Sequence, residues 1–201
     1  MEFLWLEESL DLETPSIIEI MTTGNAIDFG DCTEQASWVS CNNSTTRAIR
    51  MGGENSVSPS VQGGRLDTID FVAIASKGNA IDFGIMSLKR GETASCSNTT
   101  RGITAGGAPG NFKTIDFITM ASQGNAIIFG DLTGRTTSIA AGVSNGTRGV
   151  IAGGYTGSTS TNSIDFILFS TTGNAQDFGD VTVDRWSLGG ASDSHGGLGG
   201  F

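Results

Sequence analysis

The stretch Thr-Thr-Gly-Asn-Ala-Gln-Asp-Phe-Gly-Asp, residues Thr171–Asp180, is one of four nearly identical copies along this chain of 201 residues. The other copies begin at Thr22, Ser76 and Ser122, and an apolar run precedes each of them. In the three later copies this run contains Ile-Asp-Phe, with the aspartate at Asp70, Asp116 and Asp165. A repeated unit therefore decides the fold.

Two independent landmarks measure the period of the repeat. The glycine of Gly-Asn-Ala recurs at spacings of 54, 46 and 49 residues, and the first glycine of a double glycine recurs at spacings of 54, 47 and 46. A period near 45 to 50 residues that holds four short strands is typical of a β-propeller blade. The long first spacing is explained by a longer loop predicted over Glu54–Leu66.

Each repeat is expected to supply two strand pairs. Gly24-Asn25 predicts a hairpin between Ile17–Met21 and Ala26–Gly30, because these residue types tolerate positive φ. The next pair is predicted at Ser37–Ser40 and from Arg47 to Gly52-Gly53, around a polar turn.

This order places half of a repeat at each end of the chain. The last predicted pair is Trp186–Ser192 with Gly196–Phe201. If the two end halves pair, the prediction is an all-β, four-bladed propeller over residues 16–201, closed by its N-terminal and C-terminal half-blades and preceded by an arm, residues 1–15. The alternative is an open half-ring, two of which complete an eight-bladed ring.

Composition argues against several classes of partner. The formal net charge of −10 repels nucleic acid and anionic lipid. No apolar run reaches the length of about 18 residues that spans a bilayer, and the acidic start does not resemble a secretory signal. Cys32, Cys41 and Cys96 lack metal-ligand spacing and are expected to be small buried thiols, so neither a zinc site nor a cofactor is expected.

The double glycines, the apolar strands after them, the aromatic residues Phe83, Phe129 and Phe178, and the arginines Arg90, Arg135 and Arg185 resemble the kelch repeat. The likeness covers residues 16–201, with phenylalanine where kelch repeats carry tryptophan and few aromatics after the double glycine. The wording Gly-Asn-Ala-x-Asp-Phe-Gly-Asp-Leu-Thr and Thr-Arg-Gly-x-x-x-Gly-Gly resembles, more specifically, repeats in structural proteins of marine, especially cyanobacterial, bacteriophages. That resemblance implies a virion component.

Three sets of residues are candidates for chemistry. The repeated aspartates could ring a cation, but Ile128 and Ile85 interrupt two of the sets, so hydrogen bonding to backbone amides of neighbouring turns is the preferred interpretation. Arg47, Arg101 and Arg148 are candidates for binding anionic sugars, although bridges to carboxylates of an adjacent blade are the plainer interpretation. His195, the one histidine, is interpreted as a turn residue without a nucleophile and an orienting partner.

Outside the repeat, Phe3, Leu4, Trp5 and Leu6 form an apolar group at loosely helical spacing. They are candidates for assembly contacts with other virion proteins or a second copy of the chain, or they pack back onto the propeller. The expected function is a non-enzymatic virion protein, a head or tail decoration or a fibre component, located in the particle. The alternative is a propeller that recognises glycans on the host surface.

Overall fold

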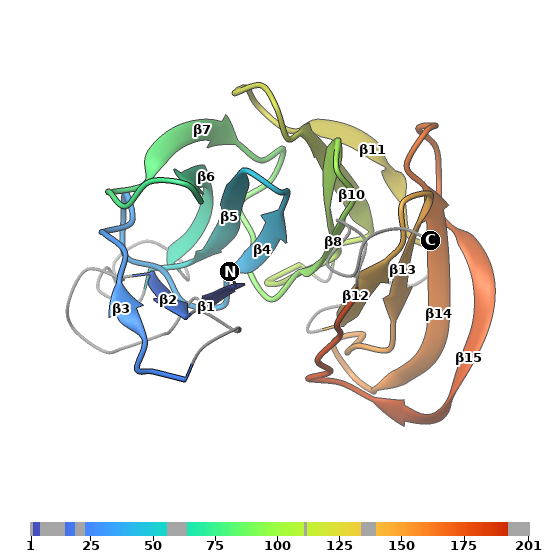
Figure 1. Cartoon of the computed structure of the whole chain (residues 1–201). Helices are drawn as coiled ribbons and strands as arrows, with labels where there is room; N and C mark the ends of the chain where they lie inside the picture. Colours follow the sequence, from blue (N-terminus) through green and yellow to red (C-terminus); the bar gives the residue numbers. More distant parts are fainter. Residues whose placement is uncertain are drawn as a thin grey trace.

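The protein is an all-β molecule of four antiparallel sheets that follow one another along the chain (Figure 1). The computed structural model describes residues 15–18, 23–55, 64–110, 112–133 and 140–192, and the backbone of residues 2–4. Sheet 1 has three strands and sheets 2 to 4 have four each. In this described part of the chain, no helix is long and apolar enough to cross a membrane.

The strands of each sheet are neighbours in sequence order. Sheet 1 contains β1 (Glu2–Leu4), β2 (Ser16–Ile18) and β3 (Ile27–Asp28). Sheet 2 contains β4 (Ser40–Asn43), β5 (Arg47–Glu54), β6 (Arg65–Ala73) and β7 (Ile81–Ile85). Sheet 3 contains β8 (Ala94–Ser97), β9 (Arg101–Ala105), β10 (Thr114–Thr119) and β11 (Ile127–Asp131). Sheet 4 contains β12 (Ala141–Ser144), β13 (Arg148–Ala152), β14 (Thr161–Leu168) and β15 (Gln176–Arg185).

The first strands of the four-stranded sheets, β4, β8 and β12, lie side by side. Their serine hydroxyls connect them: Ser95 Oγ donates to the Cys41 carbonyl at 2.7 Å, and Ser144 Oγ donates to the Ser97 carbonyl at 2.7 Å. A Cβ on Gly142 would lie 2.0 Å from the Ser95 carbonyl oxygen, so only glycine permits this approach. The sheets therefore meet along one edge and diverge outward, as Figure 1 shows.

Two predicted strand positions need correction. The first strand of sheet 2 is β4, not Ser37–Ser40, and its buried Asn42 donates through Nδ2 to Thr104 Oγ1 at 3.4 Å and to the Met51 sulfur at 3.2 Å. The Gly-Asn pairs do not form two-residue hairpin turns. They lie in seven-residue connections, residues 74–80, 120–126 and 169–175, where they contact the preceding sheet.

Among the described residues, no pairing between the half-blades at the two ends is seen. β2 has β1 on one side, with Phe3 opposite Ile17, and β3 on the other, so both of its edges are occupied. The start of the arm is thus a strand of sheet 1 rather than part of a helix. Residues 186–192 form no strand, yet a Cβ on Gly190 would lie 2.9 Å from the Gly142 carbonyl, so this segment packs beside β12. The predicted last strand, residues 196–201, lies outside the described residues.

The double glycines and the long loop are largely where the sequence predicts them. Gly106 and Gly107 follow β9 with φ of 69° and 110°, and Gly153 and Gly154 follow β13 with φ of 66° and 113°. In sheet 2 the strands run on past the double glycine until Glu54 pairs with Arg65. The predicted loop is therefore shorter than Glu54–Leu66, and its residues 56–63 lie outside the described ranges.

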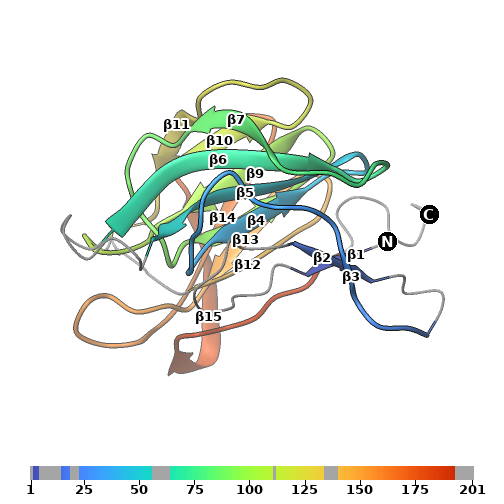
Figure 2. The same ribbon diagram turned by 90° about the vertical axis from the view of Figure 1, so that its left-hand side faces the viewer.

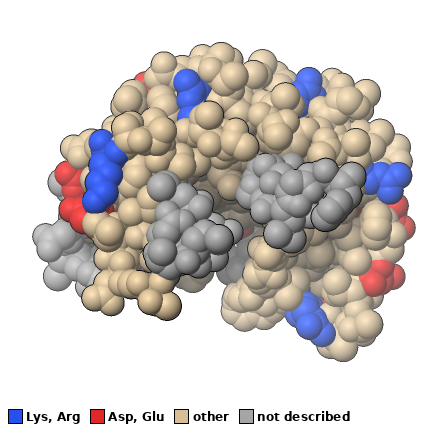
Figure 3. Space-filling model, viewed as in Figure 1, with Lys and Arg blue, Asp and Glu red and all other residues tan. Residues whose placement is uncertain are grey.

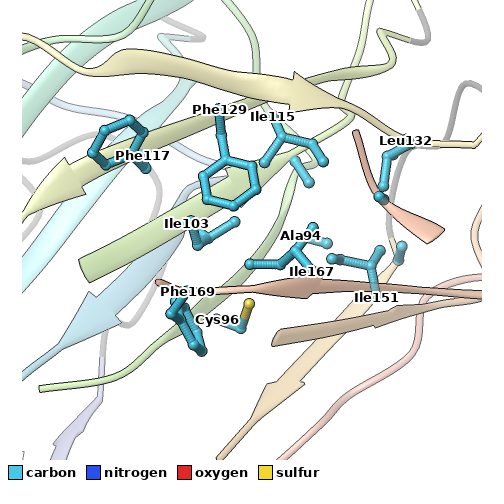
Figure 4. Packing of buried hydrophobic residues seen from close by; sticks show 13 residues of the cluster. Ala94, Cys96, Ile103, Ile115, Phe117, Phe129, Leu132, Ile151, Ile167 and Phe169 are labelled. Atoms are coloured by element: carbon cyan, nitrogen blue, oxygen red, sulfur yellow. The ribbon is translucent and has the colours of Figure 1, made fainter. Parts of the chain in front are cut away.

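The apolar core lies between sheets as well as within them. One cluster joins Ile103 and Ile115 of sheet 3 to Ile151 and Ile167 of sheet 4 (Figure 4). A second cluster joins sheet 2 to Ile118 of β10 in sheet 3 and to Met120, which follows that strand. A third cluster joins sheet 1 to sheet 2. Each boundary between sheets is therefore a buried apolar layer, which favours keeping consecutive sheets in contact.

Candidate functional site

The Gly-Asn-Ala motif binds each sheet to the sheet before it. Gly124 N donates to the Phe83 carbonyl at 2.8 Å, and Ala126 N donates to the Ile85 carbonyl at 2.8 Å. Asn125 Oδ1 accepts from the amide of Ile85 at 3.2 Å. We call this group of bonds the inter-sheet contact.

The same contact occurs at all three boundaries between described sheets. Between sheets 1 and 2 the bonds from Gly78 and Ala80 are 2.9 and 2.7 Å, and between sheets 3 and 4 those from Gly173 and Ala175 are both 2.8 Å. The asparagine bonds there are 3.2 and 3.1 Å. The best preserved phrase in the sequence is therefore the element that joins repeats.

A glycine in the outer strand makes this approach possible. A Cβ on Gly84, whose φ is 148°, would lie 2.5 Å from the Gly124 carbonyl oxygen. The equivalent distances at Gly30 and Gly130 are 2.4 and 2.2 Å. Any larger residue would push the incoming turn away from the strand.

The Ile-Asp-Phe aspartates form a second link across each boundary. Asp70 accepts from Thr33 N at 3.1 Å and from its hydroxyl at 2.7 Å, and Thr33 follows the last strand of the preceding sheet. Asp116 is bound by Ser87 and Asp165 by Thr133 in the same way. The predicted hydrogen bonding to backbone amides is confirmed for these three residues, and hydroxyl donors are added to it.

Two of these aspartates are paired with arginines that are fully buried. Arg50 of β5 binds Asp70 through two bonds, of 2.8 and 2.7 Å. Arg90, from the connection after β7, lies 3.1 Å from Asp116 and donates to the carbonyls of Gly106 and Thr114. Burial lowers the pKa of Arg90, and the charge of Asp116 opposes that effect.

The two arginines reach their aspartates from different places in the repeat. Where β5 supplies Arg50, the residue equivalent to Arg90 is the buried Ala36. Where the connection supplies Arg90, the residue of β9 opposite Asp116 is the buried Thr104. The space beside each of these two aspartates therefore holds one arginine. Sequence reasoning missed this pairing because the two arginines are not at matching positions in the repeat.

The candidate ligand-binding arginines lie over the Ile-Asp-Phe phenylalanines. The guanidinium carbon atoms of Arg47, Arg101 and Arg148 are 4.6, 4.8 and 5.2 Å from the ring centroids of Phe71, Phe117 and Phe166. Each of these rings meets a phenylalanine of the next strand edge-on, for example Phe71 with Phe83 at 5.9 Å. These contacts are cation–π and T-shaped aromatic interactions.

Two of the three arginines also cross a boundary between sheets. Arg47 Nη1 donates to the Met120 carbonyl at 2.9 Å, and Arg101 Nη1 donates to the Phe169 carbonyl. The acceptors are backbone carbonyls of the following sheet rather than the carboxylates that the sequence suggested. Arg148, in sheet 4, is exposed and makes no such bond within the described residues.

The inter-sheet contact is left unmatched at both ends of the molecule. Phe178 of β15 is 53% exposed, whereas its equivalents Phe83 and Phe129 are 3% and 4% exposed. A Cβ on Gly179 would meet no atom within 4 Å, whereas one on the equivalent Gly84 would lie 2.5 Å from the Gly124 carbonyl oxygen. Ala26 of the first Gly-Asn-Ala motif is exposed. Sheet 4 thus presents an open acceptor strand, and sheet 1 presents an open turn.

Several predicted residues lie outside this description. The backbone of Phe3 and Leu4 is in β1, but their side chains, together with Trp5, Leu6 and His195, fall outside the described residues. The described part of the chain holds no group of three His, Cys, Asp or Glu residues suited to a metal ion.

The thiols are largely buried, as the sequence predicts. Cys32 and Cys96 are buried and Cys41 is half-buried; burial raises the pKa of Cys96 to about 12. On the face shown in Figure 3, lysine and arginine are scattered singly, and acidic residues lie toward the two sides. No protein-family model matches the chain, and no curated protein matches it.

A matched pair of glycine substitutions tests the inter-sheet contact. Gly84→Ala and Gly124→Ala impose similar backbone strain, since φ is 148° and 154°, but only the Cβ at Gly84 would strike the neighbouring turn. Gly84→Ala should lower the free energy of unfolding by about 1–3 kcal/mol more than Gly124→Ala. Urea unfolding measures both, and equal losses would contradict the contact.

A double-mutant cycle tests the buried ion pair. Asp116→Asn should cost about 3–5 kcal/mol of stability, because it leaves the Arg90 charge buried without its counter-charge. The double variant Arg90→Met, Asp116→Asn should lose less stability than the sum of the losses of the two single variants. As a control, Lys89→Met, which removes an exposed charge 3.8 Å from Asp67, should change stability by less than about 1 kcal/mol. Strict additivity of the two core substitutions would rule out the pairing.

Proposed function

We propose that this protein is a non-enzymatic structural component of a bacteriophage particle, a head or tail decoration or part of a fibre, and that its sheets are blades of a kelch-like β-propeller. The observation that supports this is the inter-sheet contact. It repeats three times with nearly the same bond lengths, and its two halves are exposed at the ends. A molecule built from identical joining surfaces is suited to assembly rather than to chemistry on a small substrate.

The residues that recur from repeat to repeat support the same conclusion. The glycines, asparagines, aspartates and arginines of the best preserved phrases make contacts between sheets, as the bonds of Asp116 and Arg101 illustrate. Residues that are occupied in this way are not available to a substrate. The repeat sequence resembles repeats in structural proteins of marine phages, and for this reason we propose a phage particle as the assembly.

Two closed arrangements would extend the described sheets into a propeller. In a four-bladed ring, the C-terminal residues would pair with β2 and close the ring within one chain, which requires β1 to leave the edge of β2. In an eight-bladed ring, two chains would meet end to end. In both arrangements a further inner strand lies beside β12. The segment at Gly190 already packs there.

Recognition of host-surface glycans has narrower support. Arg47 and Arg101 lie over phenylalanines and donate to carbonyls within the molecule. Arg148 is the exposed member of the three and could offer paired donors to a sulfate or carboxylate. Glycan-array binding that is lost in Arg148→Ala would favour this function over a purely structural one.

The structural role predicts where the chain is found. Purified particles of the phage that encodes it should contain the intact chain in a fixed copy number, which quantitative mass spectrometry measures. Antibodies against the folded protein should label one defined part of the particle in electron micrographs. A chain that is abundant in infected cells but missing from purified particles would refute the proposal.

A further inference from the structure

The two ends of the molecule carry complementary halves of the inter-sheet contact. On sheet 4 the carbonyls of Phe178 and Asp180 hold the positions that accept hydrogen bonds at every internal boundary, where Phe83 and Ile85 are the equivalents. On sheet 1, Gly24, Asn25 and Ala26 hold the positions of the donor turn. Ala26 is exposed, whereas its equivalent Ala175 is 7% exposed.

The halves are not in contact with each other. Figure 1 shows β3 at one side of the molecule and β15 at the other, with the sheets following in an arc between them. In the view of Figure 2, the sheet of β1, β2 and β3 again lies well to one side of β15. Within one molecule, the contact would form only if the whole arc closed.

We propose that the open strand of sheet 4 binds the Gly24-Asn25-Ala26 turn of a second copy of this chain. A second copy meets the strand without any rearrangement, and it leaves β1 on the edge of β2. Gly24 N and Ala26 N donate to the carbonyls of Phe178 and Asp180, and Asn25 accepts from the amide of Asp180. A Cβ on Gly179 would meet no atom within 4 Å and Ala26 is exposed, so the described residues leave both surfaces uncovered.

A third group lies at the same end of the molecule. Arg47 and Arg101 each donate across a boundary that also carries an inter-sheet contact, to the sheet that supplies the turn. Arg148 has the equivalent place in sheet 4 and is exposed beside Phe166. This side chain is therefore at the same joining surface and faces the second copy.

The symmetry of the assembly follows from this geometry. Each chain has one turn and one open strand, so two copies related by a two-fold axis form a closed ring in which both ends of each chain are satisfied. The pairing also covers Phe178, and covering exposed apolar area on an outer strand favours association. This inference depends on the fold alone and holds whether or not the protein belongs to a virion.

Variants at each end test the interface separately. Ala26→Glu places a charged side chain in the turn at an exposed position, and Phe178→Glu alters the strand that receives it. Multi-angle light scattering over a dilution series should give twice the chain mass of 20.7 kDa for the wild type, and 20.7 kDa for each variant alone. Ala121→Glu, the same substitution at an exposed site away from both ends, should keep the wild-type mass.

Mixing the two variants decides the result. Ala26→Glu retains an intact strand and Phe178→Glu retains an intact turn, so an equimolar mixture should recover the doubled mass through one contact. Circular dichroism checks that each variant is folded; should Phe178→Glu fail to fold, Arg148→Glu replaces it. A wild type that stays at 20.7 kDa at every concentration, or an Ala26→Glu variant that still associates, overturns the proposal.

Discussion

Two backbone hydrogen bonds from a Gly-Asn-Ala turn to the outer strand of the preceding sheet are the interaction on which the rest of this structure depends. They fix the distance between consecutive sheets, and the apolar clusters, the aspartate bonds and the arginine bonds form at that distance. Each bond alone contributes about 0.5–1.5 kcal/mol. Their importance lies in position, because they align the side chains of two sheets that share no strand pairing.

The backbone character of the contact explains which residues of the repeat vary. The acceptor at position 85 is a main-chain carbonyl, so Ile85 serves as well as the aspartates Asp31 and Asp131 that occupy its place elsewhere. Ile128 likewise replaces an aspartate whose side chain takes no part in joining sheets. Glycine cannot be replaced where the turn touches the strand, since a Cβ would lie within about 2.5 Å of a carbonyl oxygen.

The polar links add specificity at a cost in desolvation. Arg50 with Asp70 and Arg90 with Asp116 bury four charges, which is favourable only because each carboxylate also accepts bonds from a threonine or serine. A carboxylate placed elsewhere along the strand would remain uncompensated. The bonds from Thr33 to Asp70 and from Ser87 to Asp116 cross the boundary between sheets, and they favour one register between one repeat and the next.

Much of the fold could be predicted from the sequence, because periodic glycines and apolar runs report local backbone geometry. The repeat, the all-β class and the order of strands are of this kind. The partners of Arg50 and Arg90 could not be predicted, since they depend on which of two distant positions supplies the charge beside an aspartate. The pairing of β1 with β2 was missed for a similar reason: Glu2–Leu4 resembles no strand of the repeat, and only the free edge of β2 makes it one.

Amide hydrogen exchange tests the central claim most directly. In a dilute sample, the amides of Ala80, Ala126 and Ala175 should exchange slowly, close to the rate set by global unfolding, because each donates across a boundary. The amide of Ala26, in the same sequence motif but with no acceptor among the described residues of its own molecule, should exchange rapidly. Equal protection of all four would show that the turn is stabilised within its own repeat, and would contradict the account of how the sheets are joined.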